Sequence, residues 1–167
     1  MNMTLLLQTI ATTTFVAGAI FTVVQLRHFR LAREREVALT LLGFLHQPDF
    51  VKALRLMYDL EPGLSRAQVE TRLGENMHLV YTMMTTWESL GVLVYRRQLS
   101  LDLVDDFVSG SLVLSWEKLQ RYVGEERAHR GRDTLLEWFQ WLAERMLERE
   151  SKTAVVPAYE AHRDWRA

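Results

Sequence analysis

The chain has 167 residues, with 20 Lys and Arg against 21 Asp and Glu, and it has no cysteine. A hydrophobic content of 49 % with 25 % charged residues excludes wholesale disorder, and the length suits one small domain beside a short N-terminal segment. The missing cysteine excludes thiol catalysis, disulfides and Cys-ligated zinc or iron–sulfur clusters, and the mildly acidic balance argues against nucleic acid as a partner.

The N-terminal segment is defined by its lack of charge, since residues 1–26 contain no Asp, Glu, Lys or Arg. Its apolar part, residues 5–26, has 22 residues; at about 1.5 Å per residue this helix would span roughly 33 Å, against about 30 Å for a bilayer core. This predicts one transmembrane helix, because lipid offers backbone groups no other partners. The alternatives are a buried soluble helix and a cleaved signal peptide; the latter normally begins with Lys or Arg, which residues 1–4 lack.

The orientation of this segment is indicated by its flanks. Nothing basic precedes it, and four arginines follow it directly: Arg27, Arg30, Arg33 and Arg35. Because positive residues stay on the cytoplasmic side, we expect a single-pass protein of the inner (cytoplasmic) membrane, with its N-terminus outside and residues 27–167 in the cytoplasm. The arginines either set the topology alone or also attract anionic lipid at the membrane surface.

Small and weakly polar residues recur along the apolar segment at spacings of three and four. On a helix they share one face of about 120°, since each residue turns the helix by about 100°; they are Gln8, Ala11, Thr14, Gly18, Thr22 and Gln25. Such a stripe lets another helix approach closely, so these residues are a candidate interface with a helix of a partner protein. The alternative is that Thr is tolerated in the span by bonding its own i−4 carbonyl.

Beyond the apolar segment, residues 27–47 are expected to continue the same helix, and Pro48 to begin the next one. Residues 48–150 predict a compact cytoplasmic bundle of five or six helices. Ser65 with Gln68 forms a capping box that starts a short helix, and residues 77–94 form the core helix. Gly91 inside that helix indicates a close contact with a neighbouring helix.

The second half of the bundle is expected to contain three further helices. Ser100 caps a brief one that residues 109–111 break, the next frays near Gly131, and Asp133 caps the last. Residues 151–167 predict an irregular C-terminal tail. The expected fold class is all-α: a single N-terminal transmembrane helix at residues 1–26, followed by a small cytoplasmic helical bundle.

Several runs in the core carry a resemblance to a known family. Residues 87–94 (WESLGVLV), residues 103–107 (LVDDF) and Trp116 resemble a family of small bacterial proteins of unknown function, over roughly residues 10–145. The resemblance implies an N-terminal span and a helical cytosolic domain. It implies no activity and brings no catalytic residue.

Few residues in the chain suggest chemistry. Glu126 and His129 have the Glu-x-x-His spacing of di-metal bundles, but no second copy exists and their charged surroundings favour a solvated helix end. His28 beside the apolar segment is a weak candidate ligand for a haem or pigment, and the adjacent Asp105 and Asp106 point about 100° apart on a helix. We therefore predict no catalytic, cofactor or metal residue, no bound cofactor and no small-molecule substrate.

The tail carries Tyr159 and Trp165, which are candidate anchors for a partner protein. Together these features favour a non-catalytic, single-span accessory or structural subunit of a larger integral membrane protein complex in the lipid bilayer, for example a respiratory or photosynthetic one. Its helical domain would dock on the cytoplasmic face of that complex. The alternative is a membrane-tethered signalling or adaptor module; an enzyme is disfavoured.

Overall fold

The computed structural model describes residues 3–152 and 156–166. Within its first helix, the side chains of residues 4–13, 17, 19, 29–35, 38 and 40 lie outside the description. All regular structure in the described residues is helical, which confirms the all-α prediction. The chain divides into two units, Met1–Gly43 and Phe44–Ala167.

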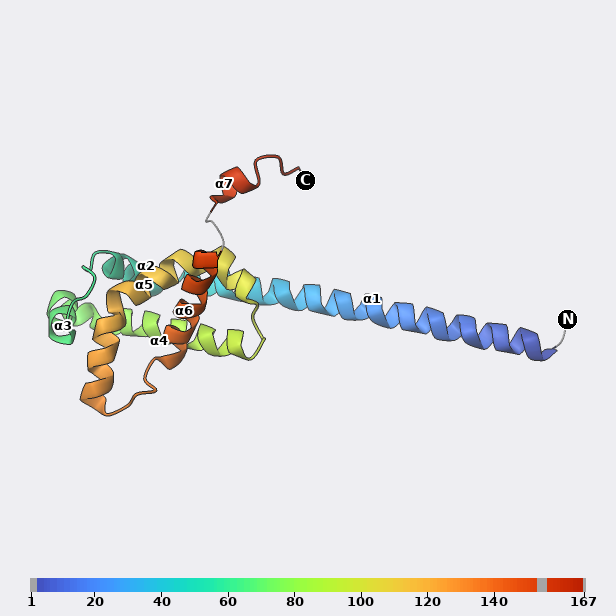
Figure 1. Ribbon diagram of the computed structural model, residues 1–167, viewed down its shortest axis with the longest axis horizontal. Helices are drawn as coiled ribbons and strands as arrows, with labels where there is room; N and C mark the ends of the chain where they lie inside the picture. The colour runs from blue at the N-terminus through green and yellow to red at the C-terminus, as the bar shows by residue number, and fades with distance from the viewer. Residues whose placement is uncertain (1–2, 153–155, 167) are drawn as a thin grey trace. The chain divides into compact units, whose positions relative to one another are not determined.

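The described part of the N-terminal unit is formed by one long helix, α1 (Met3–Leu45), which has no break (Figure 1). This single helix contains both the charge-free stretch and the arginine-bearing stretch that follows it. We predicted a transmembrane span at residues 5–26; over the residues described here, no helix combines the length and the apolar character needed to cross a membrane.

The second unit is built from helices whose starts follow local signals. They are α2 (Pro48–Tyr58), α3 (Arg66–Leu73), the 3₁₀-helix η1 (Gly74–Asn76), α4 (Met77–Tyr95), α5 (Leu101–Arg130), α6 (Glu137–Lys152) and α7 (Ala158–Ala161). Pro48 occupies the first turn of α2. At α3 the predicted capping box is present, since the Ser65 amide donates to Gln68 Oε1 at 2.8 Å and the Gln68 amide donates to Ser65 Oγ at 3.4 Å.

Helix α5 differs from the prediction, which divided it at residues 109–111. Its 30 residues continue through Gly110, where an added Cβ would meet nothing within 4 Å. Buried Val104, Val108 and Leu112 recur every fourth residue and keep one face against the core. Their burial outweighs the helix penalty of one exposed glycine, which is about 1 kcal/mol.

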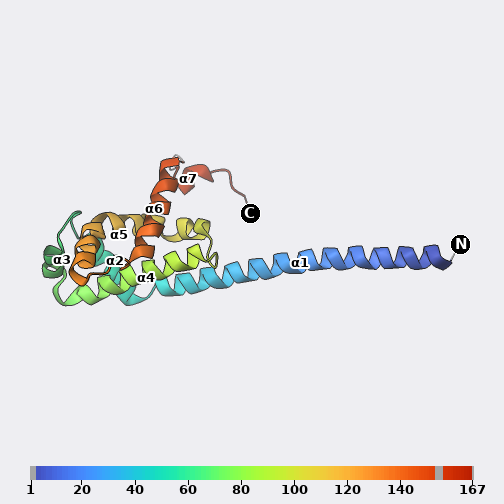
Figure 2. The same cartoon turned by 60° about the horizontal axis from the view of Figure 1, so that its bottom comes forward.

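The core lies between α2, α4, α5 and α6, and α6 packs across α4 (Figure 2). Trp87 of α4 and Phe139 of α6 are fully buried. Trp87 contacts Phe50 edge-on, and Phe139 contacts Trp116 in the same way, each pair with ring centroids 5.3 Å apart. A Cβ on Gly91 would lie 2.3 Å from the carbonyl oxygen of Trp138. The close helix contact predicted from Gly91 is therefore confirmed.

Candidate functional site

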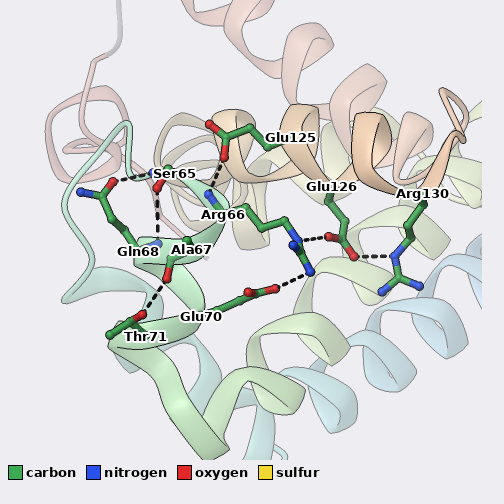
Figure 3. A network of polar contacts seen from close by, with 9 residues as sticks. All are labelled: Ser65, Arg66, Ala67, Gln68, Glu70, Thr71, Glu125, Glu126 and Arg130. Carbon is green, nitrogen blue, oxygen red and sulfur yellow. Dashed lines mark hydrogen bonds and ion pairs between the residues drawn. The ribbon is translucent and has the colours of Figure 1, made fainter.

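The main polar cluster of the second unit is centred on Glu126, a carboxylate that is only 1 % exposed (Figure 3). Its Oε2 accepts a hydrogen bond from Nε of Arg66 at 2.5 Å, and its Oε1 accepts one from Nε of Arg130. Arg66 comes from α3 and also pairs with Glu70 at 2.9 Å. Both oxygens of Glu126 are thus engaged by guanidinium groups from two helices.

The electrostatics of this cluster favour the charged form of Glu126. Burial raises the pKa of its carboxyl, but the hydrogen bonds from Arg130 and Arg66 outweigh burial, so its pKa lies below the ordinary value. Burial, with the nearby carboxylates of Glu126 and Glu70, raises the pKa of Tyr122 to about 12. At neutral pH the site therefore holds an ionised carboxylate, two arginines and a neutral tyrosine.

The interpretation of residues 125–132 as a solvated helix end is wrong for Glu126. Its position in the sequence carried a usable signal, because Glu126 follows the buried Leu119 and Val123 at helical spacing. His129 of the Glu-x-x-His pair is exposed. Within the described residues, no group of three or more His, Asp or Glu side chains could hold a metal ion.

Other charged residues of α5 satisfy backbone groups at the ends of α2 and α3. Nζ of Lys118 donates to the carbonyl oxygens of Tyr58 at 2.5 Å and Leu60 at 2.6 Å. Glu125 Oε2 accepts the amide of Arg66, the first residue of α3, at 2.7 Å. A helix end leaves such backbone groups without partners inside the helix, so these side chains stabilise the connection between α2 and α3.

The start of α6 is held in a similar way and corrects the predicted Asp133 cap. Leu136 precedes the helix with a φ of 56°, and Oε2 of Glu88, on α4, accepts the amide of Phe139 at 2.7 Å. Nε of Arg127 donates to the carbonyl of Leu135 at 2.8 Å. Burial raises the pKa of Glu88 and outweighs the opposing effect of its backbone hydrogen bonds.

The charged residues around Glu126 and at the ends of α2, α3 and α6 bond one another or the backbone. Such a network stabilises the fold. Asp105, considered above beside Asp106, also has such a role, since it pairs with Nε of Arg149 at 2.9 Å between α5 and α6. An open groove of about 620 Å³ lies along α3, lined by Glu61, Leu64, Ala67, Gln68, Thr71 and Arg72.

The predicted partner stripe of α1 falls partly within the described residues. The side chains of Gln8 and Ala11 lie outside them, and Thr14, Gly18, Thr22 and Gln25 are exposed. Thr22 donates its hydroxyl to the carbonyl of Gly18 at 2.8 Å, which is the i−4 bond that the alternative expects of a threonine. A Cβ on Gly18 would meet nothing within 4 Å. An interface along this stripe stays a prediction.

The remaining predicted positions are exposed where they are described. Arg27 and His28 are exposed, and the side chains of Arg30, Arg33 and Arg35 lie outside the described residues. Tyr159 and Trp165 in the tail are 73 % and 72 % exposed. Their roles at a membrane surface or in a partner interface stay predictions.

Sequence reasoning missed an aromatic surface that joins the end of α4 to the start of α6. Tyr95 contacts Trp138, with ring centroids 4.7 Å apart, and Trp141, with centroids 6.0 Å apart. The two tryptophans are three residues apart on one helix face, which was the available signal. Tyr95 could not be joined to them from the sequence, because that contact depends on how α4 packs on α6.

Comparison with known proteins identifies a family and nothing more specific. Residues 12–146 match the family described as a domain of unknown function, DUF4760. No curated protein and no solved structure matches the chain. The match covers nearly the stretch that the resemblance covered and most of the chain, and the chain belongs to the DUF4760 family.

Proposed function

We propose that the protein is a non-catalytic, single-span accessory subunit of a larger membrane protein complex. The observation that carries the proposal is the distribution of apolar side chains around α1. Phe15, Ile20 and Phe21 are 79 %, 59 % and 63 % exposed, and at about 100° per residue they point to three different sides of the helix. Exposed apolar side chains on several sides of one helix need an apolar environment, which a bilayer or a protein interior supplies.

The charge pattern supports a membrane anchor of defined orientation. Residues 1–26 have no charged side chain, and the arginines begin at Arg27, within the same continuous helix. A cytoplasmic location for everything after Arg27 follows from the positive-inside rule, and an inner-membrane protein with its N-terminus outside is the corresponding proposal.

The second unit supports a binding role over a catalytic one. Its most buried charged group, Glu126, has both carboxylate oxygens engaged by arginines, so it is committed to holding α3 against α5. We propose that this unit docks on the cytoplasmic face of the partner complex. The second candidate function is a membrane-tethered adaptor. In either function, the exposed Tyr159 and Trp165 of the tail would be anchors for a partner protein.

The test is co-purification of the tagged full chain from membranes in mild detergent, after confirming that the protein resists carbonate extraction. Gly18→Leu should lower recovery of the partner complex, because the larger side chain separates two helices packed at the stripe. The fold of the chain itself should not change, since nothing lies within 4 Å of a Cβ at Gly18.

Ile20→Leu, off the stripe and similar in volume, is the matched control and should leave recovery unchanged. Equal recovery of the complex for Gly18→Leu and wild type would remove the stripe as an interface. A stoichiometric complex in the wild type would favour the accessory subunit, and capture only after cross-linking would favour the adaptor. Extraction of the protein by carbonate would contradict the membrane anchor.

A further inference from the structure

The surface formed by Tyr95, Trp138 and Trp141, here called the aromatic patch, is the largest group of mutually contacting aromatic side chains reaching the surface of the second unit among the described residues. Tyr95 is 61 % exposed, and both tryptophans are partly exposed. These rings combine an apolar body with an O–H or N–H group, so they suit a boundary between apolar and aqueous surroundings.

Two arginines follow the aromatic patch directly in the sequence. Arg96 and Arg97 follow Tyr95 directly, and both are exposed. Within the described part of the chain, neither guanidinium forms an ion pair or a hydrogen bond. Two exposed arginines without an ion-pair partner among the described residues therefore come directly after Tyr95, one of the three aromatic residues of the patch.

The backbone at Arg97 has a conformation that arginine seldom adopts. Helix α4 ends there in a Schellman motif: the Arg97 amide donates to the carbonyl of Val94, and the Gln98 amide to that of Leu93, both at 2.9 Å. Arg97 occupies the left-handed position of this motif with a φ of 55°, where glycine is the usual residue.

Leu136 is the second non-glycine residue with a positive φ in the described chain, and the comparison is informative. Leu136 is only 3 % exposed, so burial of its side chain offsets the strain of its backbone. Arg97 has no such compensation, because its side chain is exposed. An arginine held in this conformation with its side chain exposed is a reason to look for a ligand.

The geometry excludes one obvious ligand class. An aromatic cage for a quaternary ammonium group needs a gap between its rings, whereas the centroids of this patch are 4.7 to 6.0 Å apart and the rings contact one another. Arg96 and Arg97 would also repel a cation. The chemistry fits a partner that is anionic and borders an apolar phase.

We propose that the aromatic patch, with Arg96 and Arg97, docks on the anionic lipid surface of the bilayer. This inference rests on the membrane anchor of the proposed function, because tethering keeps lipid headgroups at a high effective concentration and a weak contact then suffices. Tyr and Trp are enriched at the level of the headgroups, and arginine binds lipid phosphate through charge-assisted hydrogen bonds.

The experiment uses the full chain carrying Trp165→Phe, so that the aromatic patch holds the exposed tryptophans. The protein is reconstituted into vesicles of phosphatidylcholine, alone or with one quarter phosphatidylglycerol, in which the acyl chains of the phosphatidylcholine are brominated. Bromine quenches tryptophan fluorescence at short range. We expect quenching that is stronger with phosphatidylglycerol and weaker in high salt.

Arg97→Gly separates docking from stability, because it relieves the backbone strain at this position while removing the positive charge. The variant should unfold at the same or a higher temperature than wild type, yet its ratio of docked to undocked domains should fall about five-fold. Adding Arg96→Ser should bring the fall to about 30-fold. Arg132→Gly, which removes an exposed loop arginine elsewhere, is the matched control and should quench as wild type does.

Each outcome decides the proposal. Quenching that needs phosphatidylglycerol and Arg97 supports it. If the protein resists carbonate extraction but its quenching is the same with and without phosphatidylglycerol, or unchanged by Arg97→Gly, lipid docking is wrong and the anchor stands. If the protein does not insert, the anchor is wrong; quenching on adding vesicles then still supports the aromatic patch, and its absence overturns it.

Discussion

Helices α1 and α4 each carry a glycine within an apolar stretch, and the surroundings of these two glycines differ. At Gly91 of α4 a Cβ would lie 2.3 Å from the carbonyl oxygen of Trp138, whereas at Gly18 of α1 nothing lies within 4 Å. The chain uses Gly91 to bring α4 against α6. Glycine therefore allows a close helix contact within the second unit at Gly91. At Gly18 of α1 we propose that it allows a close contact with a helix of another protein.

The largest effect expected from this comparison comes from Gly91→Ala. The new methyl group would overlap backbone atoms of Trp138, which cannot move away without shifting α6 from α4. We expect a loss of about 3 kcal/mol in the free energy of unfolding, measured by chemical denaturation and followed by tryptophan fluorescence.

Gly124→Ala in α5 is the matched control, since nothing lies within 4 Å of that position and alanine is the better helix former. It should stabilise the second unit by about 0.5–1 kcal/mol. Gly18→Leu should leave the unfolding of the second unit unchanged. Equal stability for Gly91→Ala and wild type would show that α4 and α6 are not packed as closely as described.

The next effect concerns the buried carboxylate. Glu126→Gln removes the charge that Arg66 and Arg130 share, and we expect a loss of about 2 kcal/mol at neutral pH, less than for a fully buried ion pair because both arginines reach water. Glu117→Gln, at an exposed position on the same helix, should change stability little.

The pH dependence sharpens this prediction. Because the pKa of Glu126 is lowered in the folded state, its contribution is present above the ordinary value of 4.5 and is lost as the pH falls through the lower, folded value. Wild type should therefore lose more stability on acidification than Glu126→Gln. Parallel acid titrations of the two proteins, followed by denaturant midpoints, would contradict the prediction if they ran together.

The smallest effect is expected at Glu88, whose carboxylate accepts an amide at the start of α6. Glu88→Gln keeps an acceptor oxygen and should change stability by less than about 0.5 kcal/mol, whereas Glu88→Ala removes it and should cost about 1 kcal/mol, as for a lost N-cap.

Glu88 should also show the opposite pH dependence to Glu126, because its pKa is raised. Its contribution is present below the ordinary 4.5 and is lost as the pH rises through the higher, folded value. Glu88→Gln lacks this loss, so the stability of this variant relative to wild type should increase over that range. Denaturant midpoints measured across it would refute the assignment if the difference stayed constant.

The sequence by itself determined the features that act within one or two helical turns. The capping box of Ser65 and Gln68, the start of α2 at Pro48 and the cap of α5 at Ser100 all appear where local chemistry predicted them. The helical character of the described residues followed from the helical spacing of their apolar side chains. Such features need no distant partner, which is why they can be predicted one segment at a time.

Tertiary structure decided the features that depend on residues far apart in the chain. Glu126 is held ionised by Arg130 of its own helix and by Arg66, which is 60 residues away and reaches it from α3. Helix α6 begins where it does because Glu88, 51 residues before Phe139, accepts its amide, and this contact replaces the local Asp133 signal. A side chain's burial and charge depend on what packs around it, and local propensities of a fraction of a kcal/mol yield to that packing.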